Sequence, residues 1–173
     1  GQNLTAEVVV NDWGEESLAD VIFGWGEERY ARRIAKKIVD ARRTRRIATS
    51  GQLAEIITSA VPAGYRHGRT HPATKTFQAI RIAVNDEMGA LKEGLSTAWA
   101  NMQEKGRLAV ITFHSVEDRE VKHLMREWKA KGEAMPAGRQ GNPLTKSPIT
   151  PSVEEIQANP RSRSAKLRVI ERL

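Results

Sequence analysis

Basic side chains are concentrated in one short stretch of this sequence. Residues 28–46 hold nine lysines and arginines against two acids, an excess of seven positive charges that equals the formal net charge of +7 of the whole chain. A local block of cations binds a polyanion more readily than the same charge spread evenly. We therefore expect this stretch to contact nucleic-acid phosphates. Its nine cations are Arg29, Arg32, Arg33, Lys36, Lys37, Arg42, Arg43, Arg45 and Arg46.

A histidine follows the most apolar run of the chain. "RLAVITF" (107–113) has the composition of a buried parallel strand, and His114 comes directly after it. Ligand-facing residues gather at the carboxyl ends of strands in open α/β sheets. The next residues also suit the opening of a helix, with Ser115 as its cap. Substrate contact and capping both stay open for this segment. His114 is the better catalytic candidate, because a cap at Ser115 does not require it.

Asn85 and Asp86 interrupt an otherwise apolar helical stretch. Their side-chain oxygens can accept hydrogen bonds from a reacting group of a substrate and hold it in place for reaction. The alternative is a solvated helix face or a polar contact to a neighbouring domain, and charged helix residues are more often of this kind. The two residues are therefore candidate catalytic residues with a structural alternative.

Composition limits the other kinds of site. The chain has no cysteine and four histidines without paired spacing, so we expect no metal site. The absence of cysteine fits a reducing cytoplasm. The sequence contains no run of about eighteen apolar residues, so we expect no membrane-spanning helix. The chain begins with Gly1 and not with Met, so we expect a piece of a longer protein.

The elements that must position these residues fall into two groups. As far as about residue 67 the pattern predicts helices, over 15–23 and 27–43 and then after Thr49, which forms a capping box with Gln52. A basic loop follows at 65–70.

The second group mixes helices and strands. The pattern predicts, in order, one or two helices over 74–103, the strand 107–113, a helix of about 12 residues from Val116, a loop at 131–147, a short strand at "SPIT" (147–150), a helix at 152–158 capped by Ser152 and a strand at 166–173. This order favours an α/β half-sheet with a helical attachment.

Four blocks of sequence carry a resemblance to a known family. They are "GEERYARRIAKKIV" (26–39), "HPATKTFQAIRIAVNDE" (71–87), "RLAVITFHSVEDREVK" (107–122) and "NPRSRSAKLRVI" (159–170). In this order they resemble the MraW-type bacterial 16S rRNA (cytosine-N4) methyltransferases, and the likeness runs from about Thr5 onward.

The resemblance implies an activity and a fold. Members of the family use S-adenosyl-L-methionine to methylate N4 of a cytidine in the decoding region of 16S rRNA, so the expected partner is this RNA or the small ribosomal subunit, in the cytoplasm. The implied fold is α/β: the C-terminal half of a Rossmann-like class I methyltransferase domain plus an inserted all-helical domain. Residues 1–70 would form the inserted domain that recognises RNA, and residues 71–173 the C-terminal part of the methyltransferase domain.

The chain departs from the family at the site of the methyl donor. The family's donor site lies in its N-terminal half, at a glycine-rich turn after a strand. Here Gly24 and Gly26 lie between predicted helices, and Gly138 and Gly141 lie in a predicted loop. We therefore expect no cofactor-binding residues in this chain, no activity of the chain alone, and uncovered apolar faces around 107–113.

Two other functions remain open. The chain can be a freestanding, non-catalytic RNA-binding module that uses the basic helix 27–46. It can also be a DNA-binding helix-turn-helix protein built from residues 27–62. The second is the weaker alternative, because the helix that starts near residue 51 has almost no basic residues.

Overall fold

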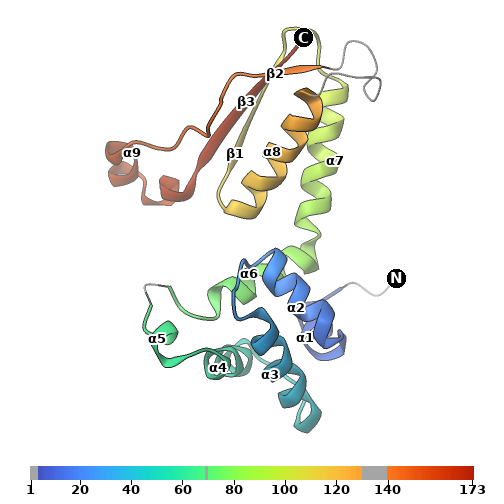
Figure 1. Ribbon diagram of the computed structural model, residues 1–173, viewed down its shortest axis with the longest axis vertical. Coiled ribbons are helices and arrows are strands. Elements are labelled where there is room, and N and C mark those ends of the chain that lie inside the picture. Colours follow the sequence, from blue (N-terminus) through green and yellow to red (C-terminus); the bar gives the residue numbers. More distant parts are fainter. Residues whose placement is uncertain (1–3, 69, 130–139) are drawn as a thin grey trace. The chain divides into compact units, whose positions relative to one another are not determined.

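The computed structural model describes residues 4–68, 70–129 and 140–173 and divides the chain into two compact units (Figure 1). The first unit is Gly1–Glu87 and the second is Met88–Leu173. The first unit extends past residue 70 because the helix α6 (Thr74–Asn85) packs against its first two helices. The assignment of residues 1–70 and 71–173 to an inserted and a catalytic domain stays a prediction.

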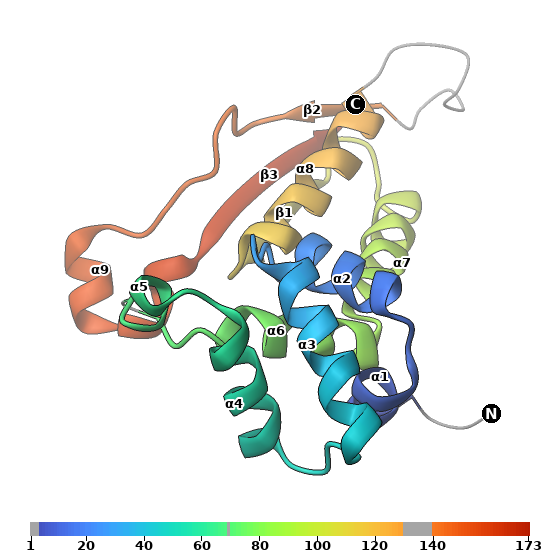
Figure 2. The ribbon, with the colours of Figure 1, turned by 60° about the horizontal axis from the view of Figure 1, so that its bottom comes forward.

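Helices build the described part of the first unit. The central one is α3 (Ala31–Thr44), which packs against α1, α2 and α4 (Figure 2). No helix in the described ranges is both long and apolar enough to cross a membrane. The remaining helices of this unit, besides α6, are α1 (Ala6–Asp12), α2 (Glu15–Gly24), α4 (Ser50–Ala60) and α5 (Ala63–Arg66).

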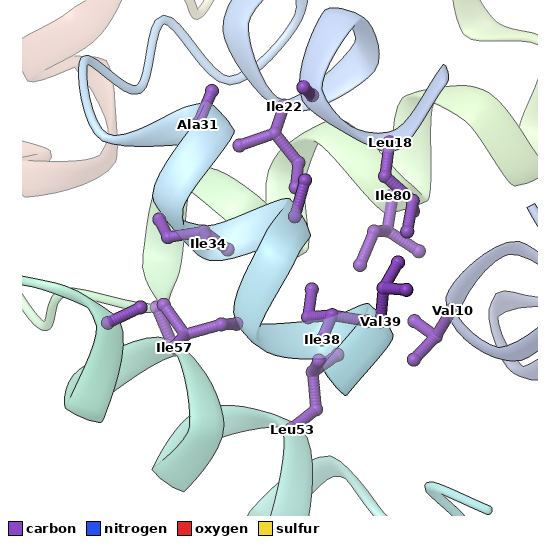
Figure 3. Close-up of a cluster of buried hydrophobic side chains, with 14 of the residues drawn as sticks. Val10, Leu18, Ile22, Ala31, Ile34, Ile38, Val39, Leu53, Ile57 and Ile80 are labelled. Carbon is purple, nitrogen blue, oxygen red and sulfur yellow. The ribbon is translucent and has the colours of Figure 1, made fainter. Parts of the chain in front are cut away.

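The core of the first unit surrounds the inner face of α3. Ile34 and Ile38 are fully buried and meet Leu18 and Ile22 of α2 and Ile57 of α4 (Figure 3). Burying a side chain of this size contributes roughly 1.5–3 kcal/mol. The predicted helical spacing is therefore confirmed for α2 and α3, and the capping box that opens α4 is present at Thr49 and Gln52.

The turn between α2 and α3 differs from the prediction. The sequence placed the start of the second helix at residue 27, whereas α3 begins at Ala31. Glu27 has a left-handed backbone (φ 50°), and a Cβ on Gly26 would lie 2.6 Å from the carbonyl oxygen of Lys75 in α6. The left-handed backbone of Glu27 interrupts a helix through these residues, and the close approach to α6 requires a glycine at position 26.

One further segment is more ordered than expected, and another agrees with one of the two predicted alternatives. The short helix α5 occupies the start of the predicted basic loop 65–70, of which Arg69 lies outside the described residues. The stretch 74–103 forms two helices, α6 and α7 (Glu87–Ala100), separated by Asp86, whose left-handed backbone (φ 46°) ends the first.

A small antiparallel sheet forms the second unit together with its helices. Strand order is β1-β3-β2, with β1 (Arg107–Thr112), β2 (Gly141–Pro143) and β3 (Lys166–Arg172). The strands predicted at 107–113 and 166–173 are confirmed. The expectation that 107–113 is a buried parallel strand is wrong for the described residues, because β1 pairs antiparallel with β3 and only alternate side chains are covered.

One face of this sheet is covered and the other is open. Helix α8 (Ser115–Lys129) packs on the face that carries Ile170, and its Trp128 stacks on Trp99 of α7 with ring centroids 4.7 Å apart. On the opposite face, Ile111 is 59% exposed. The residues of α8 that lie buried in this cluster are Val121, Leu124, Met125 and Trp128. The uncovered apolar face expected around 107–113 is confirmed.

The segment after α8 departs further from the prediction. Most of the loop expected at 131–147 lies outside the described residues, but its end forms β2, and "SPIT" contributes only a single bridge, from Ile149 to Leu167. The helix α9 (Val153–Ala158) has the predicted cap, in which Ser152 accepts the Glu155 N–H, and the 3-10 helix η1 (Pro160–Ser164) leads into β3.

A buried ion pair joins α8 to β3. The two Asp118 oxygens lie 2.7 and 3.1 Å from Nε and Nη2 of Arg168, and both residues are at least nine-tenths buried. Lys166 Nζ lies 3.6 Å from the same carboxylate. The hydrogen bond and charge of Arg168 hold the pKa of Asp118 below its usual value of 3.8.

We expect Asp118→Asn to lower the free energy of unfolding near neutral pH by roughly 3–5 kcal/mol, because Arg168 would stay buried without its counter-charge. A lowered pKa means that the stabilisation is complete above the unfolded-state pKa and is lost as the pH falls through the folded-state pKa. Urea unfolding of both proteins should therefore show a gap that persists to mildly acidic pH and closes in strong acid.

The control is Asp40→Asn, which makes the same substitution in the exposed pair with Arg43 (3.3 Å). Exposed pairs contribute little, so this variant should unfold almost like the parent protein. Equal losses in the two variants would contradict the structural role of the buried pair.

Candidate functional site

The predicted basic segment lies mostly on one side of α3. The residues of α3 that alternate with the buried Ile34 and Ile38 are cations whose side chains reach solvent. We call these residues the basic face. They are Arg32, Arg33, Lys36, Lys37 and Arg43.

Two of the nine predicted RNA-binding cations have structural partners instead. Arg42 donates to the carbonyl oxygens of Val10 (2.8 Å) and Trp13, and Arg46 pairs with Glu7 at 2.7 Å and with Asp12. Both hold the region of α1 against the end of α3. The helical spacing could have distinguished Arg42 from the solvent-facing cations. Arg42 follows the buried Ile38 by one helical turn and therefore lies on the same face of the helix.

The rest of the predicted cations are available at the surface. Lys36 and Lys37 are exposed on α3 and form no ion pair within the described residues, and Arg43 pairs only loosely with Asp40 in solvent. Arg29 and Arg45 are also exposed, just before and just after the helix. A dense row of exposed cations of this kind attracts phosphates.

Sequence reasoning missed an arrangement around a buried acid at the start of α3. Glu28 is fully buried. Its Oε1 accepts the Tyr30 N–H at 2.9 Å, and its Oε2 accepts the Tyr65 hydroxyl at 2.6 Å. The Arg29 guanidinium lies 4.9 Å from the centroids of both tyrosine rings. No periodicity marks Glu28 for burial, since it lies in a turn, so the sequence offered no signal for this cluster.

The hydroxyl of Tyr65 is a permanent donor in this cluster. Burial and the hydrogen bond to Glu28 raise the pKa of Tyr65 to about 12. The hydroxyl therefore keeps its proton at any physiological pH and holds the ring beside Arg29.

His114 caps α8, a role that the sequence assigns to Ser115. Its Nδ1 accepts the Glu117 N–H at 3.3 Å, and in return Oε2 of Glu117 accepts the N–H groups of Phe113 (2.9 Å) and His114. The other ring nitrogen, Nε2, is buried 3.1 Å from Oε1 of Glu117, without the geometry of a hydrogen bond. Capping thus does use His114, contrary to the sequence argument.

Asn85 and Asp86 lie together at the junction of α6 and α7, in the first unit. Asn85 and Asp86 are both exposed, and the Asn85 amide donates to Glu87 Oε1 at 3.2 Å. Arg81 donates to the same carboxylate at 2.8 Å. His114 belongs to the second unit. The three predicted catalytic residues therefore do not form one cluster within either unit.

The described residues do not fit the methyl donor. A donor site in such folds needs a glycine-rich turn from a strand into a helix, where the backbone approaches the ligand closely. Among these residues, the connection from β1 to α8 runs through Phe113 and His114 and contains no glycine. Gly26 is pressed against Lys75 and Gly141 against Ile170, so neither leaves room for a ligand.

The sequence profile of the MraW methylase family matches residues 1–173. Relatives named ribosomal RNA small subunit methyltransferase H align along almost the whole chain. The protein from Symbiobacterium thermophilum is 52% identical over 98% of this chain and 56% of its own length. The protein from Nostoc punctiforme is 49% identical over 100% of this chain and 54% of its own length. The chain therefore spans just over half the length of these relatives.

Proposed function

This chain belongs to the MraW methylase family, and we propose that it forms part of an enzyme that methylates the RNA of the small ribosomal subunit. The observation that carries the proposal is the family match along the whole chain, joined by the name that its curated relatives share. No comparison supports the alternative of a freestanding, non-catalytic RNA-binding module.

In this proposal the first unit binds the phosphates of the RNA. The basic face of α3 has an exposed row of cations, and neutralising phosphates with such a row supplies most of the affinity of a protein for nucleic acid. We do not assign RNA contacts to Arg42 and Arg46, because their guanidinium groups bind residues of α1. We assign this role to the helical region that the resemblance identifies as the inserted domain.

We further propose that the substrate is a cytidine in the decoding region of 16S rRNA, methylated at N4 from S-adenosyl-L-methionine, as the family resemblance implies. The lone pair of N4 is delocalised into the ring, so the amine is a weak nucleophile that must be held in line with the donor. Asn85 and Asp86 have side-chain oxygens at the surface that can accept hydrogen bonds from this amine.

His114 takes a different role from the acceptors. Because its Nδ1 accepts the Glu117 N–H, the neutral imidazole carries its proton on Nε2. A protonated Nε2 donates, and cytosine offers its ring carbonyl as an acceptor. Nε2 has no hydrogen-bond partner among the described residues, and a buried polar atom of this kind needs an explanation. We propose that the imidazole turns toward the substrate when RNA binds and that Nε2 then donates to the base.

The donor site itself belongs to the part of the relatives' length that this chain does not span. The described residues do not fit the donor, and the chain corresponds to 56% and 54% of two relatives. Phe113 and Ile111 are 56% and 59% exposed at the open face of the sheet. Exposed apolar surface of this kind marks an interface, which supports a Rossmann-like half packed there.

If the basic face binds RNA phosphates, the salt dependence of RNA affinity should change when cations of this face are removed and not when other exposed cations are removed. Replacing Lys36 and Lys37 by Gln should make the slope of log affinity against log salt shallower by about 1.4, because each phosphate of single-stranded RNA that is no longer neutralised removes about 0.7 from the slope. Arg126→Gln with Lys129→Gln is the matched control, since it removes two exposed cations from α8. Equal slopes for the two double variants would exclude a dedicated basic face.

The role of His114 can be separated from its capping hydrogen bond. In the complete enzyme, His114→Asn keeps an oxygen that caps well, so stability should be retained while kcat for methyl transfer falls about tenfold or more. His114→Ala should lower both, and the missing cap should reduce stability by about 1 kcal/mol. Methyl-transfer assays with thermal unfolding measure the two effects, and full activity of His114→Asn would reduce this residue to a cap.

The missing donor site is testable by calorimetry. Titration of the purified 173-residue chain with S-adenosyl-L-methionine should give no saturable heat at micromolar donor, because no glycine-rich turn after a strand is present in the described residues. The complete enzyme is the positive control. Saturable binding by this chain would overturn the placement of the donor site outside it.

A further inference from the structure

A hollow of about 360 Å³ lies beside the start of α3. Its apolar wall includes Phe23, which is 66% exposed although its neighbour Ile22 in the same helix is fully buried. The volume lies within the range of small-ligand sites, roughly 300–1,000 Å³. The family match does not explain why a large aromatic ring stays in solvent at this position.

Every charged residue that lines this hollow is an arginine. They are Arg29, Arg32 and Arg33, and no acid lines it among the described residues. Arg29 and Arg33 both approach the ring of Tyr30, at 4.9 and 5.8 Å from its centroid. The guanidinium groups repel each other at this short separation, and a bound anion would lower this repulsion. The hollow is therefore suited to binding an anion.

The cation at this site is held in place before any ligand arrives. Arg29 rests on Tyr30 and Tyr65, and Tyr65 is fixed by its hydrogen bond to the buried Glu28. Both oxygens of Glu28 are used by the two tyrosines, so this acid does not form an ion pair with Arg29 in the described structure. A pre-positioned cation loses little entropy on binding.

We propose that this hollow binds one unstacked nucleotide of single-stranded RNA, with its base on Phe23 and its phosphate among Arg29, Arg32 and Arg33. An aromatic face beside clustered arginines is the combination that single-stranded nucleic acid requires, since each base has a π-face and each phosphate a charge. Paired bases are stacked within a duplex and cannot reach Phe23. The inference rests on the proposed RNA substrate and adds a nucleotide subsite to it.

The test uses the full chain and a single-stranded RNA dodecamer containing one 2-aminopurine, whose fluorescence is quenched by stacking. Wild-type protein should quench this signal on binding, and a duplex of the same sequence should give no quenching. Phe23→Ala should abolish the quenching and weaken binding about tenfold. Phe23→Trp keeps an aromatic face and should retain both. Arg33→Gln should weaken binding with a shallower salt slope, by about 0.7.

Val153→Ala is the matched control, because Val153 is also 66% exposed but lies in α9 of the second unit. It should bind and quench like wild type, and circular dichroism should show that Phe23→Ala stays folded. Salt-dependent RNA binding that is unchanged in Phe23→Ala would overturn the nucleotide subsite and leave the proposed function standing. Absence of any RNA binding would overturn both. Tighter, Phe23-dependent binding to phosphatidylserine vesicles would replace RNA by a membrane as the partner.

Discussion

The buried carboxylate of Glu28 is the constraint on which the first unit depends. A carboxylate removed from water must have its oxygens satisfied, and here a backbone N–H and the Tyr65 hydroxyl do so. These bonds set where α3 begins and bring α5, which contains Tyr65, against its first turn. The preceding turn can follow only because Gly26 lets the backbone pass close to α6. The register of α3, and with it the direction of every cation on the helix, follows from this point.

A single helix therefore serves two purposes in this unit. Its inner face, with Ile34 and Ile38, fills the core between α2 and α4, while its outer face carries cations. Arg42 lies on the inner side of α3 and stabilises the packing of this unit, because its guanidinium donates to a carbonyl oxygen near the end of α1. The basic segment is thus a mixture, and only its outward members are suited to phosphate.

The second unit is stabilised by the packing of one helix on one face of its sheet and by a buried ion pair. A single face of a small antiparallel sheet is covered by α8, and the buried pair of Asp118 and Arg168 fastens that helix to the central strand. The opposite face keeps apolar side chains such as Ile111 in solvent. The proposed Rossmann-like half would cover this face, and it would also supply the donor site that the connection through His114 lacks.

The sequence by itself determined the helices with a clean apolar period, the caps at Thr49 and Ser152, the strands at 107–113 and 166–173, and the family. These features depend on neighbours within a few residues or on long matching blocks. Only the tertiary structure decided that β1 pairs antiparallel, that His114 caps α8, and that Arg42 turns inward while Arg29 rests on two tyrosines. The reason is physical: strand direction and side-chain partners depend on segments far apart in the chain, and no local pattern encodes a contact such as that of Glu28 with Tyr65, 37 residues away.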